Sequence, residues 1–283
     1  MNRPAVPIED LLDHSAIVAA HPDDEVLWFS SILMRVDQVI LVYHDVPSKP
    51  ALTQGRNTAV AGLPYKQLHT LRLVESEVFE GASWPQPEIR DYGVAVRHTR
   101  NAMKGFAAKR YEANHRLLVD KLRSLLVGSK NVFTHNPWGE YGNEEHVQVF
   151  RAVASLQDEI GFRLWFSNYA SNKSSGLMAQ YVTQLSSDVV TLPTDPALGR
   201  SLTALYQEAG CWTWFDDYEW PAEETLIAWA GATATPRPHG HVLDMHLIPV
   251  QWPPLPRPSK PTTVRQRLRD VKRSIKRLLG RDV

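Results

Sequence analysis

The chain has 283 residues, a formal net charge of zero and a single cysteine. A balanced charge argues against the general electrostatic attraction on which nucleic-acid binding depends, and one cysteine excludes an internal disulfide and a cysteine-rich metal site. The first residues lack the apolar core of a secretory signal, and no run approaches the roughly 18 apolar residues of a membrane span, so we expect a cytoplasmic protein with no nucleic-acid partner.

Predicted strands and helices alternate through the first 170 residues. Residues 15–20 form a short apolar run that predicts a buried strand, and residues 24–35 place apolar side chains at helical spacing. Further along we predict strands at 36–46, 71–74, 131–137 and 162–169, helices at 52–62, 109–126 and 144–156, and a loop at 77–104. This alternation predicts an α/β fold, in which helices cover both faces of a mostly parallel sheet.

The composition of the chain changes near residue 252, where a proline-rich stretch begins and a basic segment follows. Residues 252–261 contain five prolines, which suit neither the interior of a sheet nor a helix. We therefore predict one domain over residues 1–251, a proline-rich linker over 252–262 and a basic helical tail over 263–283.

The tail is expected to form an amphipathic helix. An apolar stripe runs along it, and eight lysines and arginines between residues 264 and 283 face only two acids. One interpretation docks this helix on the protein's own acidic surface, or on a second subunit of a homo-oligomer. The other places it on an anionic membrane, which would give the protein a peripheral position on the inner membrane face.

A histidine and three acids follow directly on the first predicted strand, in the order His21-Pro22-Asp23-Asp24-Glu25. Ligands of parallel α/β sheets lie at this edge, beyond the carboxyl ends of the strands. One interpretation is that the acids only cap the following helix. The other is a divalent metal site, because an imidazole and a carboxylate three residues apart, as in His21 and Asp24, can converge on one ion. Asp23 would then remain unligated beside the ion.

The third ligand is expected from a second strand-to-helix turn, within residues 133–150. This stretch follows another strand, contains two glycines, and ends at a helix start that carries Glu144, Glu145 and His146. The two turns can face each other across one edge of the sheet. Two histidines and one carboxylate with an open position make a known catalytic set, although these ligand types suit iron(II) or cobalt as well as zinc.

Both stretches resemble the motifs of one family. His21-Pro22-Asp23-Asp24-Glu25 resembles the AHPDDE signature of the PIG-L/LmbE zinc-dependent de-N-acetylases, and THNPWGEYGNEEHVQV resembles their second motif. The resemblance covers about residues 12–170. It implies a Rossmann-like fold in a single catalytic domain. It also implies removal of acetyl from N-acetylated amino sugars, including sugar conjugates of inositol, lipids and antibiotics.

The resemblance also implies roles for single residues. His21, Asp24 and His146 would hold the zinc ion, leaving open coordination for water and the amide oxygen. Asp23 would be the general base on that water. The expected substrate is a small amino-sugar conjugate, and a lipid-linked sugar is one alternative within that class.

Three residues close to the last ligand complete the implied site. Tyr141 matches a family tyrosine that helps polarise the carbonyl, and Glu145 falls where the family often has an acid. Asn143 departs from the family, which has a histidine at this position. An asparagine can donate a hydrogen bond to an oxyanion but cannot deliver a proton. Either Asp23 makes both proton transfers, or another residue is the acid, or the activity is weak.

Three further residues are candidates for substrate binding. Arg56 stands where many family members have an arginine near the substrate, and His44 and His135 end predicted strands at the same sheet edge. Residues 211–221 concentrate aromatic side chains, which suit either core packing or stacking on a sugar. A second histidine group, without a clear scaffold for a metal, comprises His239, His241 and His246.

Two hypotheses from different classes follow from these residues. The leading one is a zinc-dependent de-N-acetylase that acts on an N-acetylated amino sugar or its glycoconjugate. The alternative is a non-catalytic carbohydrate- or partner-binding protein that retains the fold, and Asn143 favours it. Asp23 favours the enzyme, because a binding protein has no need of an unpaired base beside a metal.

Overall fold

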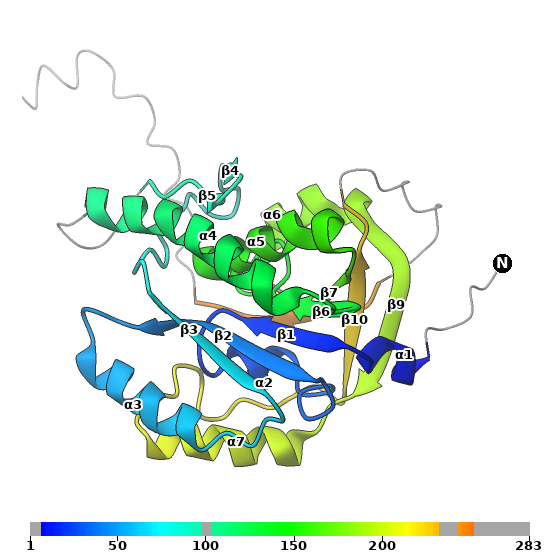
Figure 1. The fold of residues 1–283 in the computed structure, drawn as a ribbon. Coiled ribbons are helices and arrows are strands. Elements are labelled where there is room, and N and C mark those ends of the chain that lie inside the picture. Colours follow the sequence, from blue (N-terminus) through cyan, green and yellow to red (C-terminus); the bar gives the residue numbers. More distant parts are fainter. Residues whose placement is uncertain (1–6, 98–103, 232–242, 252–283) are drawn as a thin grey trace, which may run out of the picture. The chain divides into compact units, whose positions relative to one another are not determined.

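A seven-stranded sheet lies at the centre of the computed structural model, which describes residues 7–97, 104–231 and 243–251 (Figure 1). In spatial order its strands are β3 (Leu68–Val74), β2 (Gln38–Asp45), β1 (Ser15–Ala19), β6 (Asn131–Thr134), β7 (Arg163–Ser167), β10 (Glu223–Trp229) and β9 (Leu185–Pro193). The first five are parallel to one another, and β10 runs antiparallel to both of its neighbours. The predicted mostly parallel sheet is confirmed.

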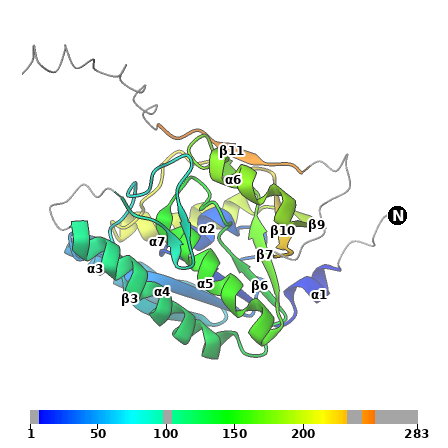
Figure 2. The ribbon, with the colours of Figure 1, turned by 90° about the horizontal axis from the view of Figure 1, so that it is seen from above.

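Helices cover both faces of this sheet, as predicted (Figures 1 and 2). One face carries α2 (Asp24–Trp28), α3 (Pro50–Ala61) and α7 (Pro196–Glu208), and the other carries α4 (Lys104–Leu126), α5 (Glu144–Ile160) and α6 (Ser175–Tyr181). The remaining elements are α1 (Ile8–Leu12), a 3-10 turn at Val182–Gln184, and two short strand pairs, β4 (Ile89–Arg90) with β5 (Gly93–Val94) and β8 (Tyr169–Ser171) with β11 (His246–Ile248).

The apolar run at residues 15–20 becomes the central strand because every side chain of β1 is buried between two parallel neighbours. From β1 the chain proceeds to β2 on one side, whereas β6 flanks β1 on the other side. Strand order therefore reverses at β1, and the turns that leave β1 and β6 open into the same crevice. This topology brings the two predicted motifs to one edge of the sheet.

One predicted helix is shorter than expected. The segment 24–35 is helical only to Trp28, although Ile32 is buried as its helical spacing predicts. The backbone N–H of Ser31 donates to the buried carboxylate of Glu224 at 3.1 Å. Because this N–H is bound to Glu224, it does not make the backbone hydrogen bond that would continue the helix. A tertiary contact thus overrides the local helical periodicity.

The predicted linker at 252–262 and the tail at 263–283 lie outside the described residues, so both remain predictions. Among the helices that the structure does describe, none has the length and apolar character needed to cross a membrane.

Candidate active site

The turn after β1 holds Asp23 in a backbone conformation that side-chain-bearing residues rarely adopt, with φ at 109°. Glu25 stabilises this turn, because its carboxylate accepts the Asp23 N–H at 3.0 Å. The same carboxylate accepts the hydroxyls of Tyr65 and Tyr206 at 2.8 and 2.6 Å, and Glu25 is fully buried. The third acid of the motif therefore shapes the turn.

His21, Asp24 and His146 meet as predicted, and all three are buried. Asp24 Oδ2 lies 3.1 Å from His21 Nδ1 and 3.2 Å from His146 Nε2. Ligand atoms around a tetrahedral ion with bonds near 2.1 Å lie about 3.4 Å apart, so these spacings fit a divalent metal. The contact between His146 Nε2 and Asp24 does not have the geometry of a hydrogen bond, and this buried nitrogen makes no other hydrogen bond among the described residues, as is expected of a nitrogen that binds a metal ion.

Two carboxylates orient the histidine rings from behind. Glu140 Oε2 lies 2.7 Å from His146 Nδ1, and Glu145 Oε2 lies 3.0 Å from His21 Nε2. Such outer carboxylates fix the tautomer of a metal-binding histidine and direct its other nitrogen at the ion. Burial opposes protonation of His146, yet Asp24 and Glu140 together raise its pKa to about 9. The sequence alone did not predict this role for Glu140. Its only signal was its position six residues before the predicted ligand His146.

We call His21, Asp24 and His146 the metal group, after the ion that they could hold. Asp23 lies beside this group and is not part of it. Its Oδ2 accepts two hydrogen bonds from Thr213, from the backbone N–H at 3.0 Å and from the hydroxyl at 2.6 Å. Burial, followed by the charge of Asp24, raises the pKa of Asp23 to about 7, while Thr213 opposes that rise. A carboxyl group with a pKa near neutrality is matched to accepting and returning a proton.

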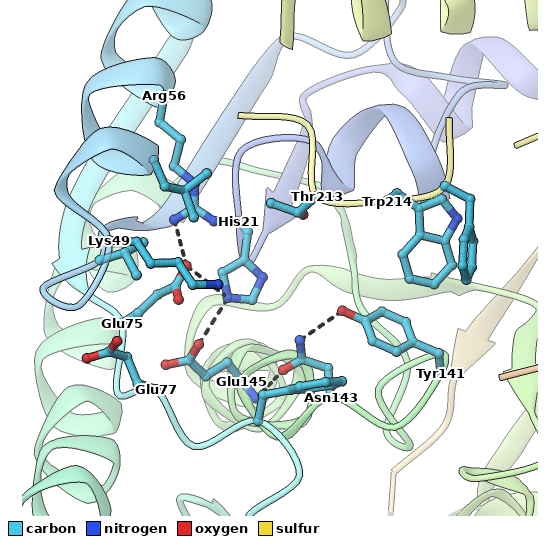
Figure 3. Close-up of a pocket in the computed structure, with 14 residues that line it drawn as sticks. His21, Lys49, Arg56, Glu75, Glu77, Tyr141, Asn143, Glu145, Thr213 and Trp214 are labelled. Carbon is cyan, nitrogen blue, oxygen red and sulfur yellow. Dashed lines mark hydrogen bonds and ion pairs between the residues drawn. The ribbon is translucent and has the colours of Figure 1, made fainter. Parts of the chain in front are cut away.

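A cavity of about 380 Å³ opens above these groups. Among the predicted residues, His21, Arg56, Tyr141, Asn143 and Glu145 line it (Figure 3). Asp23, Asp24 and His146 are buried and are not among the residues that line it. The cavity is thus continuous with the metal group through His21.

Asn143 is the N-cap of α5, and both the oxygen and the nitrogen of its amide make hydrogen bonds. Its Oδ1 caps the helix by accepting the Glu145 N–H at 2.8 Å, and its Nδ2 donates to the Tyr141 hydroxyl at 3.0 Å. Because the Tyr141 oxygen accepts this bond, its own proton is available to another acceptor. Burial, and next Asp24, holds the pKa of Tyr141 well above its usual value, so the hydroxyl stays protonated.

The three predicted substrate residues occupy different positions. Arg56 lines the cavity and donates to Glu75 at 2.6 Å. His44 is buried outside the lining, with Nε2 at 2.9 Å from Asn57. His135 is fully buried behind the metal group, where Nε2 accepts the Ala20 N–H at 2.8 Å and Nδ1 lies 3.0 Å from Glu140. Substrate contact by His44 or His135 stays a prediction that these positions do not favour.

The aromatic segment 211–221 divides between the core and the cavity, and stacking on a sugar stays a prediction. Trp220 packs in the core and donates to Val26, whereas Trp214 and Phe215 line the cavity. In the second histidine group, His246 pairs with the carbonyl of Glu223 at 2.8 Å. The other two members, His239 and His241, lie outside the described residues.

Comparison with known proteins gives matches only at the level of solved structures. No family model matches the chain, and no curated protein matches it. The zinc-inhibited form of teicoplanin deacetylase Orf2 is 12% identical, with a TM-score of 0.47 over 76% of this chain and 97% of that one. A deacetylase–teicoplanin complex is 14% identical (TM-score 0.45, 76% and 97% covered). The pseudoaglycone deacetylase Dbv21 is 14% identical (TM-score 0.44, 75% and 95% covered). The chemistry of the site is therefore interpreted from its own residues.

Proposed function

We propose that the protein is a metal-dependent hydrolase that removes acetyl from an N-acetylated amino sugar or its glycoconjugate. The observation that carries this proposal is the pairing of a His–Asp–His group with a separate buried carboxylate. His21, Asp24 and His146 have the spacing of metal ligands, and Asp23 stands next to them with a pKa raised to about 7. The motif resemblance supplies the substrate class.

The residues of the chain divide the work of amide hydrolysis. A divalent ion bound by His21, Asp24 and His146, for which we propose zinc, would polarise the amide carbonyl and make a water molecule more acidic. Asp23 takes a proton from that water as its oxygen bonds to the carbonyl carbon. Tyr141 donates its hydroxyl proton in a hydrogen bond to the carbonyl oxygen.

The leaving amine needs a proton, and Asn143 has none to give. Asp23 therefore returns the proton that it accepted, the carbon–nitrogen bond breaks, and acetate and free amine result. Oδ2 of Asp23 is occupied by Thr213, whereas Oδ1 accepts no hydrogen bond from the residues that the structure describes. We assign both proton transfers to Oδ1.

The second candidate is a non-catalytic carbohydrate-binding protein. It is favoured by Asn143, whose amide is engaged in capping α5 and in holding Tyr141. The two candidates differ in what they require of Asp23, because binding alone does not need a carboxylate held beside the metal group.

Zinc-loaded protein is expected to release free amine from a panel of N-acetylglucosamine conjugates, as detected with fluorescamine. Asp23→Asn should keep the metal and lose roughly 10²–10⁴-fold in turnover, because a positioned base contributes that much. His146→Ala should lose the metal, measured by elemental analysis. A matched control is His69→Ala, since His69 lies on β3, pairs with Gln67 and is not among the residues that line the cavity.

Two results would overturn the assignment. Near-normal turnover in Asp23→Asn removes Asp23 from the mechanism. Zinc-loaded protein that binds the conjugates without releasing amine supports the carbohydrate-binding alternative.

A further inference from the structure

The cavity has two chemically different walls (Figure 3). On one side Lys49, Arg56, Glu75 and Glu77 offer charged groups that suit sugar hydroxyls. On the other side aromatic rings follow one another, with centroid separations of 6.0 Å from Phe79 to Tyr141, 4.8 Å from Tyr141 to Trp214 and 5.0 Å from Trp214 to Phe215. The aromatic side continues from the candidate carbonyl-binding tyrosine to the rim.

The size of the cavity limits what it can enclose. Its volume of about 380 Å³ is at the low end of the roughly 300–1,000 Å³ typical of ligand pockets. A single amino sugar whose amide reaches Tyr141 fits within this space. A large group attached to that sugar extends past the rim.

Two phenylalanines stand at that rim with about half of their surface in solvent, Phe79 at 50% and Phe215 at 54%. Exposed apolar surface at a ligand-binding groove is one of the features that mark an interaction site. We call Phe79 and Phe215 the rim pair. The rim pair lies next to the proposed sugar site, where it can contact a group attached to the sugar.

Phe79 is fixed in this exposed position by its surroundings. The Lys173 ammonium lies 4.5 Å from the centre of its ring, and Lys173 itself is only 2% exposed. The backbone on either side is tied to the start of α5, because Ser76 N–H donates to Glu145 at 2.6 Å and Glu80 N–H donates to Glu144 at 3.1 Å.

Phe215 is fixed from the other side of the site. It stands two residues after Thr213, whose hydroxyl and N–H are bound to Asp23, and its ring contacts Trp214 at a centroid separation of 5.0 Å. The backbone segments that carry both rings are therefore anchored to groups of the site, which lowers the entropy cost of binding to them.

We propose that the rim pair is a subsite for an aromatic aglycone attached directly to the amino sugar. The inference rests on the proposed function, since it takes the sugar to lie against Tyr141. A flat ring can contact Phe79 or Phe215 edge to face and remove apolar surface from water at the same time. A small polar aglycone makes neither contact.

The test compares three N-acetylglucosaminides that differ only in their aglycone: methyl, hexyl and 2-naphthyl. Zinc-loaded protein should show a kcat/KM for the naphthyl glycoside about tenfold above that for the methyl glycoside, because one edge-to-face ring contact acts together with the apolar surface that it buries. The hexyl glycoside should fall between them. In the double variant Phe79→Ala/Phe215→Ala the naphthyl-to-methyl ratio should drop to within about twofold of one.

Phe106→Ala is the matched control, because Phe106 is 55% exposed on α4 and does not line the cavity. It should keep the full ratio. A wild-type ratio near one, or a ratio that survives in the double variant, overturns the subsite. A hexyl glycoside equal to the naphthyl glycoside replaces an aromatic subsite with a general apolar one and so contradicts the proposal as stated.

Calorimetric binding of the same glycosides separates this inference from the proposed function. Tighter binding of the naphthyl glycoside without amine release supports the subsite and refutes the hydrolase. Amine release with no aglycone preference in rate or affinity supports the hydrolase and refutes the subsite.

Discussion

The general base of the proposed reaction is held at two points by residues far apart in the chain. Glu25 binds the backbone N–H of Asp23 and thereby maintains its positive φ, while Thr213 binds the carboxylate. Thr213 follows Asp23 by 190 residues. Because both of its bonds reach Oδ2, they leave the other oxygen directed away from Thr213. Thr213 is thus a positioning residue for the base.

Thr213→Val removes the hydroxyl, keeps the shape of the side chain and keeps the backbone bond. We expect kcat to fall by about tenfold to 100-fold, since hydrogen bonds to charged groups contribute about 1.5–3 kcal/mol. Metal content should not change, because Thr213 lies outside the group of candidate metal ligands. Steady-state kinetics measures kcat, elemental analysis measures the metal, and Thr213→Ser should recover most of the loss. A Val variant with normal kcat would show that the hydroxyl has no role in positioning.

At the scale of elements, α3 supports the segment that carries Thr213. Gly55 lies against residues 209–211 so closely that an added Cβ would stand 2.5 Å from the Ala209 carbonyl oxygen and 2.8 Å from the Cys211 Cβ. Neither is the end of a flexible side chain. The approach of α3 to this segment therefore depends on a glycine, and the next residue, Arg56, lines the cavity.

Gly55→Ala should push residues 209–211 away from α3 and displace Thr213 with them. We expect a loss of about 1–3 kcal/mol in the free energy of unfolding, as for other overpacked sites, together with a lower kcat. Urea denaturation measures the first effect. Gly62→Ala, at the C-cap of the same helix, is the control, because its Cβ would meet only the Ala59 oxygen, at 3.5 Å. Equal stability of the two variants would contradict this account of the packing.

At the scale of the whole molecule, the site exists because strand order reverses at β1. His21 and Asp24 leave β1, and His146 comes from the helix after β6, more than a hundred residues later. An ion bound by all three would join the two turns to each other. Metal binding would therefore stabilise the folded chain against an unfolded one in which these residues are separated.

Zinc added to chelator-treated protein should raise the melting temperature by about 5 °C or more. An ion present at 100 times its Kd contributes about 2.7 kcal/mol, and 1 kcal/mol corresponds to roughly 2–4 °C for a domain of this size. Differential scanning fluorimetry measures the shift. His146→Ala should show none, whereas Asp23→Asn should show the full shift, because Asp23 is not a ligand. The same shift in His146→Ala would place the ion elsewhere.

The spacing of residues along the sequence was sufficient to predict features that depend on residues close together in the chain. The His21–Asp24 pair is set by a tight turn after an apolar strand, and the alternation of strands and helices predicts the parallel sheet. The pairing of the two motifs also followed from sequence, because the carboxyl ends of parallel strands share one edge. The early end of α2 did not follow, since Glu224 approaches it from a distant strand.

Only the tertiary structure shows which side chains surround the candidate metal ligands His21, Asp24 and His146. Thr213, Glu140 and Phe79 come from segments without periodicity, whose paths are determined by contacts with distant residues. Glu25 reads as one more acid at a helix start, yet three donors converge on it in the folded chain. The ligands of the proposed metal site follow from short-range geometry and strand order, whereas the groups that orient the base and shape the cavity depend on long-range packing, which periodicity does not encode.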